Sequence, residues 1–413
     1  MDRGHFQKLV AESLPRLVDL ARRLVRCPSE NPPGDTGPLA ALIERELDGV
    51  SCTRVVARAP AVNLVARVAM GRPGRRLVLN GHLDTFPAGP AEAWTTPPFG
   101  GEVRDGKLYG RGAADMKAGL AGGIMTALLL GAARPALAGE LVLALVGDEE
   151  TGGRWGTQHL LAEMPEARGD AMLSADAGSP EVVRFGEKGQ MWIEVHAAGK
   201  AAHGAHVHLG TNAIDRLTAS LAAVKSLEAT PAPVPAPVLT AIEAARPISE
   251  PVSGDGEAAV LRRLTVNVGT IAGGQAVNLV PDSAVARCDL RFPPGLSVAD
   301  VERAVHARLG GLPGISWRVL SATEPNVTAP DHELVELVRR NAETVLRRPV
   351  AVNMRVGFSD ARFYRQAGVP AVVYGPTPYG MGGVDEHVTL ADLEAVFRVH
   401  ALTAFDYLAR SGR

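Results

Sequence analysis

Apolar positions along the chain follow two spacings, which together predict a protein of mixed helices and strands. In residues 6–25 apolar side chains recur every three or four positions, which predicts one helix with a single buried face. Short β-branched runs bounded by glycine and proline, at residues 63–68 and 77–80, predict strands. Further on, a helical pattern at 116–130 is followed by an apolar strand pattern at 140–146. This alternation indicates an α/β layer around a buried, largely parallel sheet.

From about residue 189 the pattern changes to one typical of a small α+β domain. Its predicted elements are strands at 191–196, 265–268 and 284–292 and a helix at 212–227. After residue 295 the first pattern resumes, with predicted helices at 298–309, 333–346 and 390–408 and a strand at 371–374. We therefore expect a discontinuous larger domain, residues 1–188 and 297–413, that is interrupted by an inserted domain, residues 189–296.

Composition and charge narrow the class of protein. The 413 residues exceed what one hydrophobic core usually supports, which agrees with two domains. A net charge of −2 predicts no general attraction to nucleic acid or to an anionic membrane. The cysteines, Cys27, Cys52 and Cys288, are odd in number and far apart, which argues against a disulfide framework. The N-terminus lacks an uninterrupted apolar stretch, so we expect a cytoplasmic protein.

Several predicted strands end in histidine or acidic residues. Because the carboxyl ends of parallel strands meet at one edge of an open α/β sheet, these side chains are expected to lie together. In the segment Gly81-His82-Leu83-Asp84, the extended geometry places His82 and Asp84 on the same face. Asp84 can then accept the second imidazole N–H while His82 binds a metal ion. Taken alone, a structural histidine is the simpler interpretation of this pair.

Carboxylates follow at three more positions of the same kind. Asp115 lies in a glycine-rich turn before a helix, Asp148-Glu149-Glu150 follow a buried strand, and Asp176 follows another. Separately, Asp115 can be explained as a helix N-cap, the three acids as a solvated loop and Asp176 as a turn residue. Three consecutive acids at a buried strand end are costly unless a positive group neutralises them. Together with His82 they predict a divalent metal site, where zinc, manganese or cobalt fits better than magnesium.

Short segments over nearly the whole chain carry a family resemblance. They are residues 29–34 (SENPPG), 82–84 (HLD), 110–117 (GRGAADMK), 148–152 (DEETG), 186–189 (GEKG), 278–281 (NLVP) and 289–291 (DLR). These segments resemble the M20 family of metallopeptidases, which includes succinyl-diaminopimelate desuccinylases, acetylornithine deacetylases, aminoacylases and glutamate carboxypeptidases. The resemblance implies a zinc-peptidase-like α/β fold, with a mostly parallel sheet sandwiched by helices and an inserted α+β lid or dimerisation domain.

The resemblance also implies a role for each strand-end residue. Asp115 would bridge two metal ions, with His82 and Asp176 on one ion and Glu150 on the other. Zinc is the first choice of metal, and manganese and cobalt are the alternatives. Glu149 would act as the general base that takes a proton from metal-activated water. The implied reaction is hydrolysis of an amide C–N bond in a small substrate.

The inserted domain is implied to contribute a catalytic histidine. His203 would stabilise the oxyanion, often across a dimer interface, so the resemblance implies a homodimer formed through this domain. Without the resemblance, His203 would be interpreted as a surface histidine. His206 and His208 lie close in the sequence and leave that assignment open.

Other residues are implied to recognise a substrate carboxylate. Asn278 and Arg291 are spaced like the substrate contacts of the family, and Arg291 can hold a carboxylate. Residues 357–363 resemble a loop that cradles the carboxylate, which singles out Ser359 and Arg362. An alternative for Ser359 is a helix N-cap. An N-acyl amino acid or a dipeptide is therefore the expected kind of substrate.

One expected metal ligand is missing. The family pattern H-x-x-D-E places a histidine four residues before a glutamate, but Gly382 occupies that position before Glu386. His387 could replace it if the glycine-rich loop bends, or it could face solvent. If nothing replaces it, one ion remains, which can still generate hydroxide. Two other functions stay open: hydrolytic removal of an amine from a non-peptide, for example aromatic, substrate, and non-catalytic binding.

Overall fold

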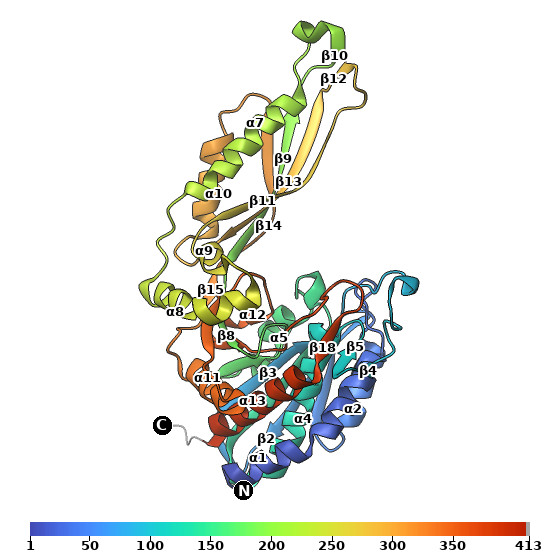
Figure 1. The fold of residues 1–413 in the computed structure, drawn as a ribbon, viewed down its shortest axis with the longest axis vertical. Coiled ribbons are helices and arrows are strands. Elements are labelled where there is room, and N and C mark those ends of the chain that lie inside the picture. The colour runs from blue at the N-terminus through green and yellow to red at the C-terminus, as the bar shows by residue number, and fades with distance from the viewer. Residues whose placement is uncertain (410–413) are drawn as a thin grey trace.

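A nine-stranded sheet forms the centre of the computed structural model, which describes residues 1–409 (Figure 1). Its strands are β1 (Ser51–Arg58), β2 (Ala61–Ala69), β3 (Arg72–His82), β6 (Ala138–Val146), β7 (Ala171–Ser174), β8 (Val182–Glu187), β15 (Asn326–Val327), β16 (Ala351–Arg355) and β17 (Ala371–Val373). They lie in the order β1-β2-β6-β3-β7-β17-β8-β15, and β16 pairs with β8. The four neighbours β6, β3, β7 and β17 run parallel, whereas β1, β2 and β15 pair antiparallel with their neighbours. The predicted parallel sheet is thus confirmed for its central strands.

Both faces of this sheet are covered by helices. Alternate residues of the central strands belong to different cores: Leu77 and Leu79 of β3 face one, and Val78 faces the other. The first core includes α1 (Arg3–Glu12), α2 (Leu14–Val25), α3 (Gly37–Glu46), α4 (Ala118–Ala133), α11 (Glu333–Leu346) and α13 (Leu390–Ala409). The second includes α5 (Thr157–Glu163), α6 (Pro165–Arg168) and α12 (Ala361–Gln366). The period of two along β3 therefore places the sheet inside a sandwich of helices, as expected.

The N-terminal helix predicted over residues 6–25 is in fact two helices. Helix α1 ends before Ser13, and α2 begins directly after it with Pro15 in its first turn. Proline has no N–H to continue the preceding helix, and its ring clashes with the carbonyl group four residues earlier. The prediction of a single helix was wrong for this reason, although Phe6, Val10 and Leu17 are buried as their spacing predicted.

Helix α4 runs through the first core directly behind the strand ends. Among the described residues, the helical segment Ala113–Ala136 is long and apolar enough to cross a membrane, but 72% of its apolar window is buried inside the protein. Such burial is typical of the core helix of a soluble protein. Gly119 brings α4 close to the end of β7, because a Cβ atom there would lie 2.5 Å from the carbonyl oxygen of Ala175.

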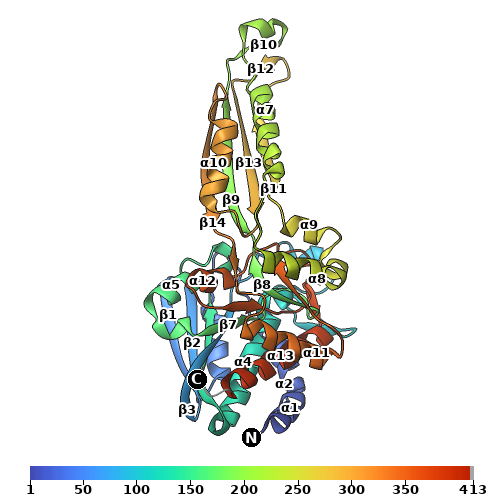
Figure 2. The same ribbon diagram turned by 90° about the vertical axis from the view of Figure 1, so that its left-hand side faces the viewer.

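A second sheet forms a separate layer, with its strands in the order β11-β13-β9-β14. These strands are β9 (Gly189–Ala198), β11 (Thr265–Gly273), β13 (Ser283–Phe292) and β14 (Ile315–Thr323), and all pair antiparallel. Helices α7 (Ala213–Lys225) and α10 (Val298–Leu309) pack against this sheet. Figures 1 and 2 show the layer projecting from the large sheet, with the short strands β10 (Ala202–His203) and β12 (Leu279–Val280) at its far tip.

The second layer does not coincide with residues 189–296. Helix α10 and strand β14 follow residue 296, yet β14 pairs with β9 from Ile315 to Thr323. Conversely, α8 (Ala236–Ser253) and α9 (Glu257–Leu261) lie within the predicted insertion but place Ile242 and Leu261 in the core of the large sheet. The division into folding domains at 189 and 296 stays a prediction, whereas the sheet itself extends to Thr323.

A small third sheet borders the site, in the order β18-β5-β4. Its strands are β4 (Glu102–Arg104), β5 (Lys107–Tyr109) and β18 (His387–Thr389). The pairing of β18 with β5 brings the C-terminal glycine-rich segment beside the turn that precedes α4. Residues almost 280 positions apart in the sequence therefore meet at one edge of the molecule.

Candidate metal centre

The carboxyl ends of three neighbouring parallel strands carry the predicted metal ligands. Strand β3 ends at His82, and β7 ends two residues before Asp176. On the other side of β3, strand β6 ends at Val146, shortly before Glu149 and Glu150. Because β6, β3 and β7 are adjacent and parallel, these side chains emerge at the same edge of the sheet.

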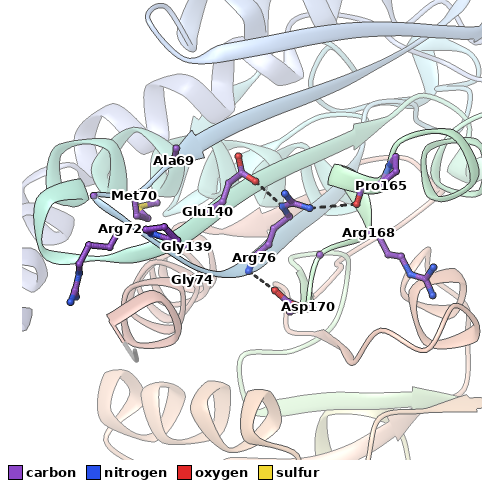
Figure 3. Close-up of a pocket in the computed structure, with 13 residues that line it drawn as sticks. Ala69, Met70, Arg72, Gly74, Arg76, Gly139, Glu140, Pro165, Arg168 and Asp170 are labelled. Carbon is purple, nitrogen blue, oxygen red and sulfur yellow. Dashed lines mark hydrogen bonds and ion pairs between the residues drawn. The ribbon is translucent and has the colours of Figure 1, made fainter. Parts of the chain in front are cut away.

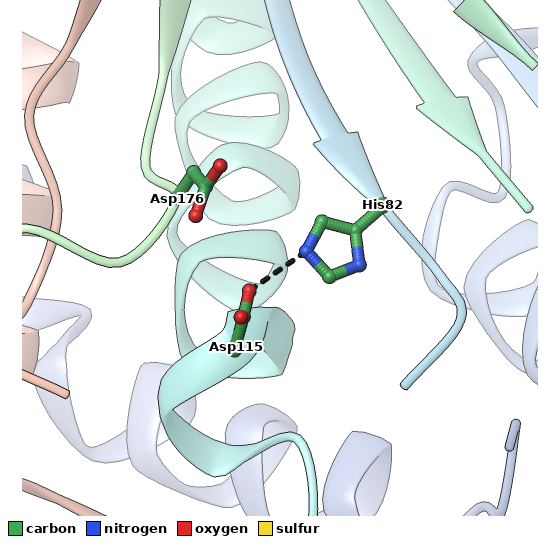
Figure 4. A group of neighbouring side chains, drawn as sticks. All are labelled: His82, Asp115 and Asp176. Atoms are coloured by element: carbon green, nitrogen blue, oxygen red, sulfur yellow. Dashed lines mark hydrogen bonds and ion pairs between the residues drawn. The ribbon is translucent and has the colours of Figure 1, made fainter. Parts of the chain in front are cut away.

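His82, Asp115 and Asp176 lie together in the structure. Each offers one ligand atom, and the three atoms all lie within 4.8 Å of one another. Figure 4 shows Asp115 approaching from the turn before α4, with its Oδ1 atom 2.8 Å from His82 Nε2. One imidazole nitrogen and two carboxylates are the donor set of many zinc sites, and the group is largely shielded from water. These residues therefore fit a divalent metal ion.

The second nitrogen of His82 has a main-chain partner. Nδ1 lies 2.8 Å from the carbonyl oxygen of Asp84, whereas the Asp84 carboxylate is 3.6 Å away. The prediction that the Asp84 carboxylate accepts the second imidazole N–H was therefore wrong. The carbonyl oxygen of Asp84 is the closer acceptor. An acceptor at Nδ1 leaves Nε2 free for a metal ion and fixes the orientation of the ring.

The Asp84 carboxylate instead holds the acidic turn after β6. It is fully buried and accepts hydrogen bonds from the main-chain N–H groups of Glu149 and Glu150, both at 3.2 Å. The Asn31 side chain donates a third hydrogen bond at 2.9 Å. Burial raises the pKa of Asp84, while His82 and these donors oppose the shift. Asp84 thus acts on the site by fixing the main chain that carries Glu149.

Asp115 is held from the main-chain side by a buried ion pair. Arg111 and Glu386 form this pair, and Glu386 Oε1 accepts the N–H groups of Ala114 at 2.9 Å and of Asp115 at 3.2 Å. The Asp115 side chain faces His82, so the N-cap explanation does not account for it. Arg111 and Glu386 were missed as site residues, although both lie within or beside segments that carry the family resemblance.

Burial and mutual repulsion dominate the titration of the acidic residues. Burial raises the pKa of Glu149 well above its usual value, and the charge of Asp360 adds to the shift. Burial also raises the pKa of Glu150 to about 8. In the described part of the chain, the buried Oε1 atom of Glu150 has no hydrogen-bond partner. A cluster of this kind is stabilised by an added positive charge.

The pKa of His82 is raised and the pKa of Asp115 is lowered. Burial by itself lowers the pKa of His82, but the hydrogen bond and charge of Asp115, with the charge of Glu149, raise it well above the usual value. Burial raises the pKa of Asp115, but the hydrogen bond and charge of His82 outweigh it and lower the pKa. The contact between the two side chains thus opposes the effect of burial on both pKa values.

Arg355 is a further site residue that the sequence did not reveal. It ends β16, and its Nη1 atom lies 3.3 Å from Asp176 Oδ2. Burial lowers the pKa of Arg355, but the charges of Asp176 and Glu187 outweigh this and raise it, so the guanidinium group stays charged. Strand direction could not have revealed it, because β16 runs parallel to β8 and therefore antiparallel to β17 and β7.

Arg291 and Arg362 lie close to one aromatic ring. The guanidinium carbon of Arg291 is 4.5 Å, and that of Arg362 5.3 Å, from the ring centre of Phe358. Arg291 Nε also contacts the Asp289 carboxylate at 2.8 Å. Arg362 Nη1 lies 3.6 Å from Glu149 Oε1, which connects this pair of arginines to the acidic cluster.

Ser359 is buried and contacts both Glu187 and Arg362. Its hydroxyl group donates to Glu187 and accepts the N–H of Ala361, the first residue of α12, at 3.3 Å. Its carbonyl oxygen accepts from Arg362 Nη1 at 2.9 Å. The N-cap of α12 is Asp360, so the N-cap interpretation of Ser359 was wrong by one residue, and the Ser359 carbonyl group orients Arg362.

His203 and Asn278 lie at the tip of the second layer. Figures 1 and 2 show β10, which contains His203, at the opposite end of the molecule from the large sheet. The main-chain N–H of Gly204 donates to the carbonyl oxygen of Asn278 at 2.6 Å, so the two predicted residues are neighbours. Both are exposed. A single chain does not bring either of them to the metal centre.

His387 is not part of the metal-binding group within the described residues. Its ring stacks on Tyr379 at 5.1 Å and lies 4.8 Å from the ring of Tyr109. Its Nδ1 atom is 2.8 Å from the carbonyl oxygen of Asp385. The imidazole is therefore neither directed to the metal group nor freely solvated, because the pairing of β18 with β5 places it between two tyrosines.

A surface cavity of about 610 Å³ lies at the other end of the large sheet (Figure 3). Arg76 crosses it, with its Nε 2.7 Å from Glu140 and its main-chain N–H donated to Asp170 at 2.7 Å. The lining includes several arginines but neither histidine nor cysteine. Since its acids already pair with Arg76, this cavity does not compete with the His82 group as a metal centre.

The fold and the site define a class of protein. A histidine and acids at the carboxyl ends of parallel strands, with an additional glutamate beside them, are the parts of a metal-dependent hydrolase. Residues 78–406 match peptidase family M20/M25/M40, and the chain belongs to this family. It is accordingly a metallohydrolase that acts on C–N bonds.

Relatives align over almost the full length of the chain. A succinyl-diaminopimelate desuccinylase from Cereibacter sphaeroides is 34% identical over 408 residues, covering 95% of this chain and 99% of that protein. One from Rhodospirillum centenum is 31% identical over 391 residues, covering 92% and 94%.

Among solved structures, an M20 family metallo-carboxypeptidase from Sulfolobus solfataricus superposes with a TM-score of 0.77 at 18% identity, covering 96% of this chain and 99% of that one. Human carnosine dipeptidase 1 superposes with a TM-score of 0.74 at 17% identity, covering 99% and 100%. At such identities the likeness shows the shared fold alone, and it confirms the α/β sandwich with a second layer.

Proposed function

We propose that the protein hydrolyses the amide bond of a small carboxylate-bearing substrate, such as an N-acyl amino acid or a dipeptide. The observation that carries the proposal is the position of Glu149 beside the metal-binding group but outside it, facing Arg362. The aligned relatives named desuccinylases act, by that name, on an N-succinyl amine, which supports an acyl amide as the target.

The residues of the chain divide the work of this reaction. His82, Asp115 and Asp176 would hold a divalent ion, zinc first and manganese or cobalt as alternatives, whose charge would lower the pKa of water and polarise the carbonyl group. Glu149 accepts the proton of the attacking water and returns it to the leaving nitrogen. The Asp84 carboxylate keeps Glu149 in place by accepting a hydrogen bond from the main-chain N–H of Glu149.

Arg291 and Arg362 are the proposed anchors for the substrate carboxylate. Their guanidinium groups lie near the same Phe358 ring, and Arg362 also approaches Glu149. A carboxylate held there would lie within reach of the residue that moves the proton, which favours one orientation of the scissile bond. Ser359 supports this arrangement by accepting a hydrogen bond from Arg362 through its carbonyl oxygen.

Removal of the metal tests the catalytic proposal. Dialysis against a chelator is expected to abolish hydrolysis, and addition of zinc, manganese or cobalt to restore it, because the charge on the water is lost with the ion. The assay is a panel of N-acyl amino acids, including N-succinyl derivatives, with dipeptides and aryl amines. Turnover of aryl amines alone would favour the alternative amine-releasing reaction. No turnover with any metal would contradict both.

A homodimer formed through the second layer belongs to the same proposal. His203 lies in β10 and Asn278 directly precedes β12, and both strands lie far from the large sheet (Figures 1 and 2), so a role of these residues in catalysis would be at the site of another copy. The second layer also exposes apolar side chains, among them Trp192, Val268, Ile271 and Leu320, which a second copy could cover. Asn278 would then contact the substrate, and His203 would donate to the oxyanion.

Mixing two inactive variants tests the dimer. H203A is expected to lose about 10²–10³-fold in kcat, the cost of removing one oxyanion donor. Co-refolding H203A with E149Q should restore part of the activity, because one site of each mixed dimer combines an intact His203 with an intact Glu149. A strictly monomeric protein by light scattering, or no recovery on mixing, would contradict this arrangement. H206A serves as the matched control and should stay active.

A cytoplasmic location is part of this proposal. Cys27, Cys52 and Cys288 are all free thiols in the structure. Burial raises the pKa of each, so the thiols stay protonated and are poorly reactive. Free thiols of this kind suit a reducing compartment.

A further inference from the structure

We propose that the metal centre holds one divalent ion per chain, on His82, Asp115 and Asp176, because Gly382 deprives a second position of its imidazole. The inference rests on the proposed function, since both require a metal ion at this group. It goes further in assigning the number of ions and the residue that sets it.

Some of the ligands that a second metal ion would need are present. The buried Oε1 atom of Glu150 has no hydrogen-bond partner in the described part of the chain. Asp115 and Glu150 by themselves would give a second ion two carboxylate ligands, whereas zinc in proteins takes three or four ligands. Glu150 is accordingly absent from the three-residue group that the described residues form.

Gly382 and Asp115 are connected through the ion pair of Arg111 and Glu386. Arg111 Nη2 donates to the carbonyl oxygen of Gly382 at 3.1 Å, while Arg111 pairs with Glu386, which in turn accepts the N–H of Asp115. A Cβ atom at position 382 would meet, among the described atoms within 4 Å, only Phe86 Cδ2 at 3.8 Å. Position 382 next to this ion pair therefore has room for a side chain that the chain does not provide.

His387 does not fill that role. Its ring is stacked on Tyr379, and its Nδ1 atom is engaged with the carbonyl oxygen of Asp385. Its main chain is fixed by the pairing of β18 with β5 opposite Tyr109. These contacts hold the ring between Tyr379 and Tyr109, and His387 lies outside the metal-binding group that the described residues form.

A fixed positive charge accompanies the single ion. The guanidinium group of Arg355 lies 3.3 Å from Asp176 Oδ2. The acidic cluster therefore receives part of its neutralisation from the chain itself. By contrast, a Bacillus subtilis relative in fold, superposed with a TM-score of 0.67 at 14% identity, is described as a dinuclear metal-binding peptidase.

Metal counting tests the number of ions. Metal-free protein is titrated with zinc by calorimetry, and zinc per chain is measured by mass spectrometry after dialysis. The wild type is expected to bind one zinc per chain. E150Q should also bind one, since Glu150 lies outside the group, whereas D176N should lose tight binding. H387A is the matched histidine control and should leave the count at one.

Restoring the imidazole tests the role of Gly382. G382H is expected to raise the count from one to two zinc ions per chain, and the double variant G382H/E150Q to return it to one. Gly382 has a φ of 73°, a left-handed conformation that asparagine and histidine tolerate better than most residues. G382N is therefore the backbone control, expected to fold and to bind one zinc.

Three outcomes would overturn the inference: two zinc ions in the wild type, loss of the ion in E150Q, or a folded G382H that still binds one. These are separate from the fate of the proposed function. One zinc without turnover on the substrate panel would reject the function and leave the count standing. Turnover with two zinc ions bound per chain would support the function and reject the inferred count.

Discussion

Replacement of Glu149 by glutamine is expected to lower kcat by roughly 10²–10⁴-fold, the usual contribution of a general base. Glutamine matches glutamate in size but cannot accept the proton of the attacking water. The metal content should stay at the wild-type level, because Glu149 is not part of the His82, Asp115 and Asp176 group. The measurements are kcat on the best substrate of the panel and zinc per chain.

The design separates chemistry from folding. The turn that carries Glu149 is fixed through its main-chain N–H by Asp84, and this hydrogen bond is unaffected by E149Q. E163Q, an exposed change at the end of α5, controls for the loss of one carboxylate and should retain full activity. Wild-type kcat in E149Q would remove Glu149 as the base. Loss of zinc in E149Q would instead make it a ligand.

The central features of the site could be predicted from the sequence because they follow from local patterns. The short run at residues 77–80 predicts a strand, and His82 stands at the end of that strand, β3. The same applies to Asp176 after β7. Parallel neighbours then bring these ends together whatever the detailed packing is. The metal-binding group therefore depends on where each strand ends, which local sequence patterns indicate.

The partners of these residues depend on features that spacing does not encode. The path of the main chain after β3 decides whether His82 contacts the carboxylate or the carbonyl group of Asp84. The distances from His82 Nδ1 to these two groups, 3.6 Å and 2.8 Å, differ by less than 1 Å. Arg355 approaches Asp176 from β16, which pairs with β8 and runs antiparallel to β7. Both contacts are set by tertiary packing.

The remaining differences arise from long-range pairing. His387 is placed between Tyr109 and Tyr379 by the pairing of β18 with β5, across nearly 280 residues. Strand β14 joins the second layer by pairing with β9, although it follows the predicted domain boundary. A break in hydrophobic pattern marks a change of element, but it does not show to which sheet the next strand returns.

Replacement of Asp115 by asparagine is expected to abolish tight metal binding, and hydrolysis with it. Asp115 contacts His82 directly, and its ligand atom lies within 4.8 Å of that of Asp176, so its carboxylate belongs to both halves of the group. An asparagine amide is neutral and offers one oxygen in place of two. The loss in zinc affinity should exceed the roughly 10–100-fold that removal of an outer partner of a ligand costs. Calorimetric titration with zinc measures it.

The fold should survive this change, which makes the result interpretable. The main-chain N–H of Asp115 is held by Glu386, and that hydrogen bond does not involve the Asp115 side chain. D170N is the matched control, because Asp170 accepts a main-chain N–H from Arg76 at the opposite end of the sheet (Figure 3). It should bind zinc as the wild type does. Wild-type zinc affinity in D115N would contradict the assignment of the metal group, because His82 and Asp176 alone would then have to hold the ion.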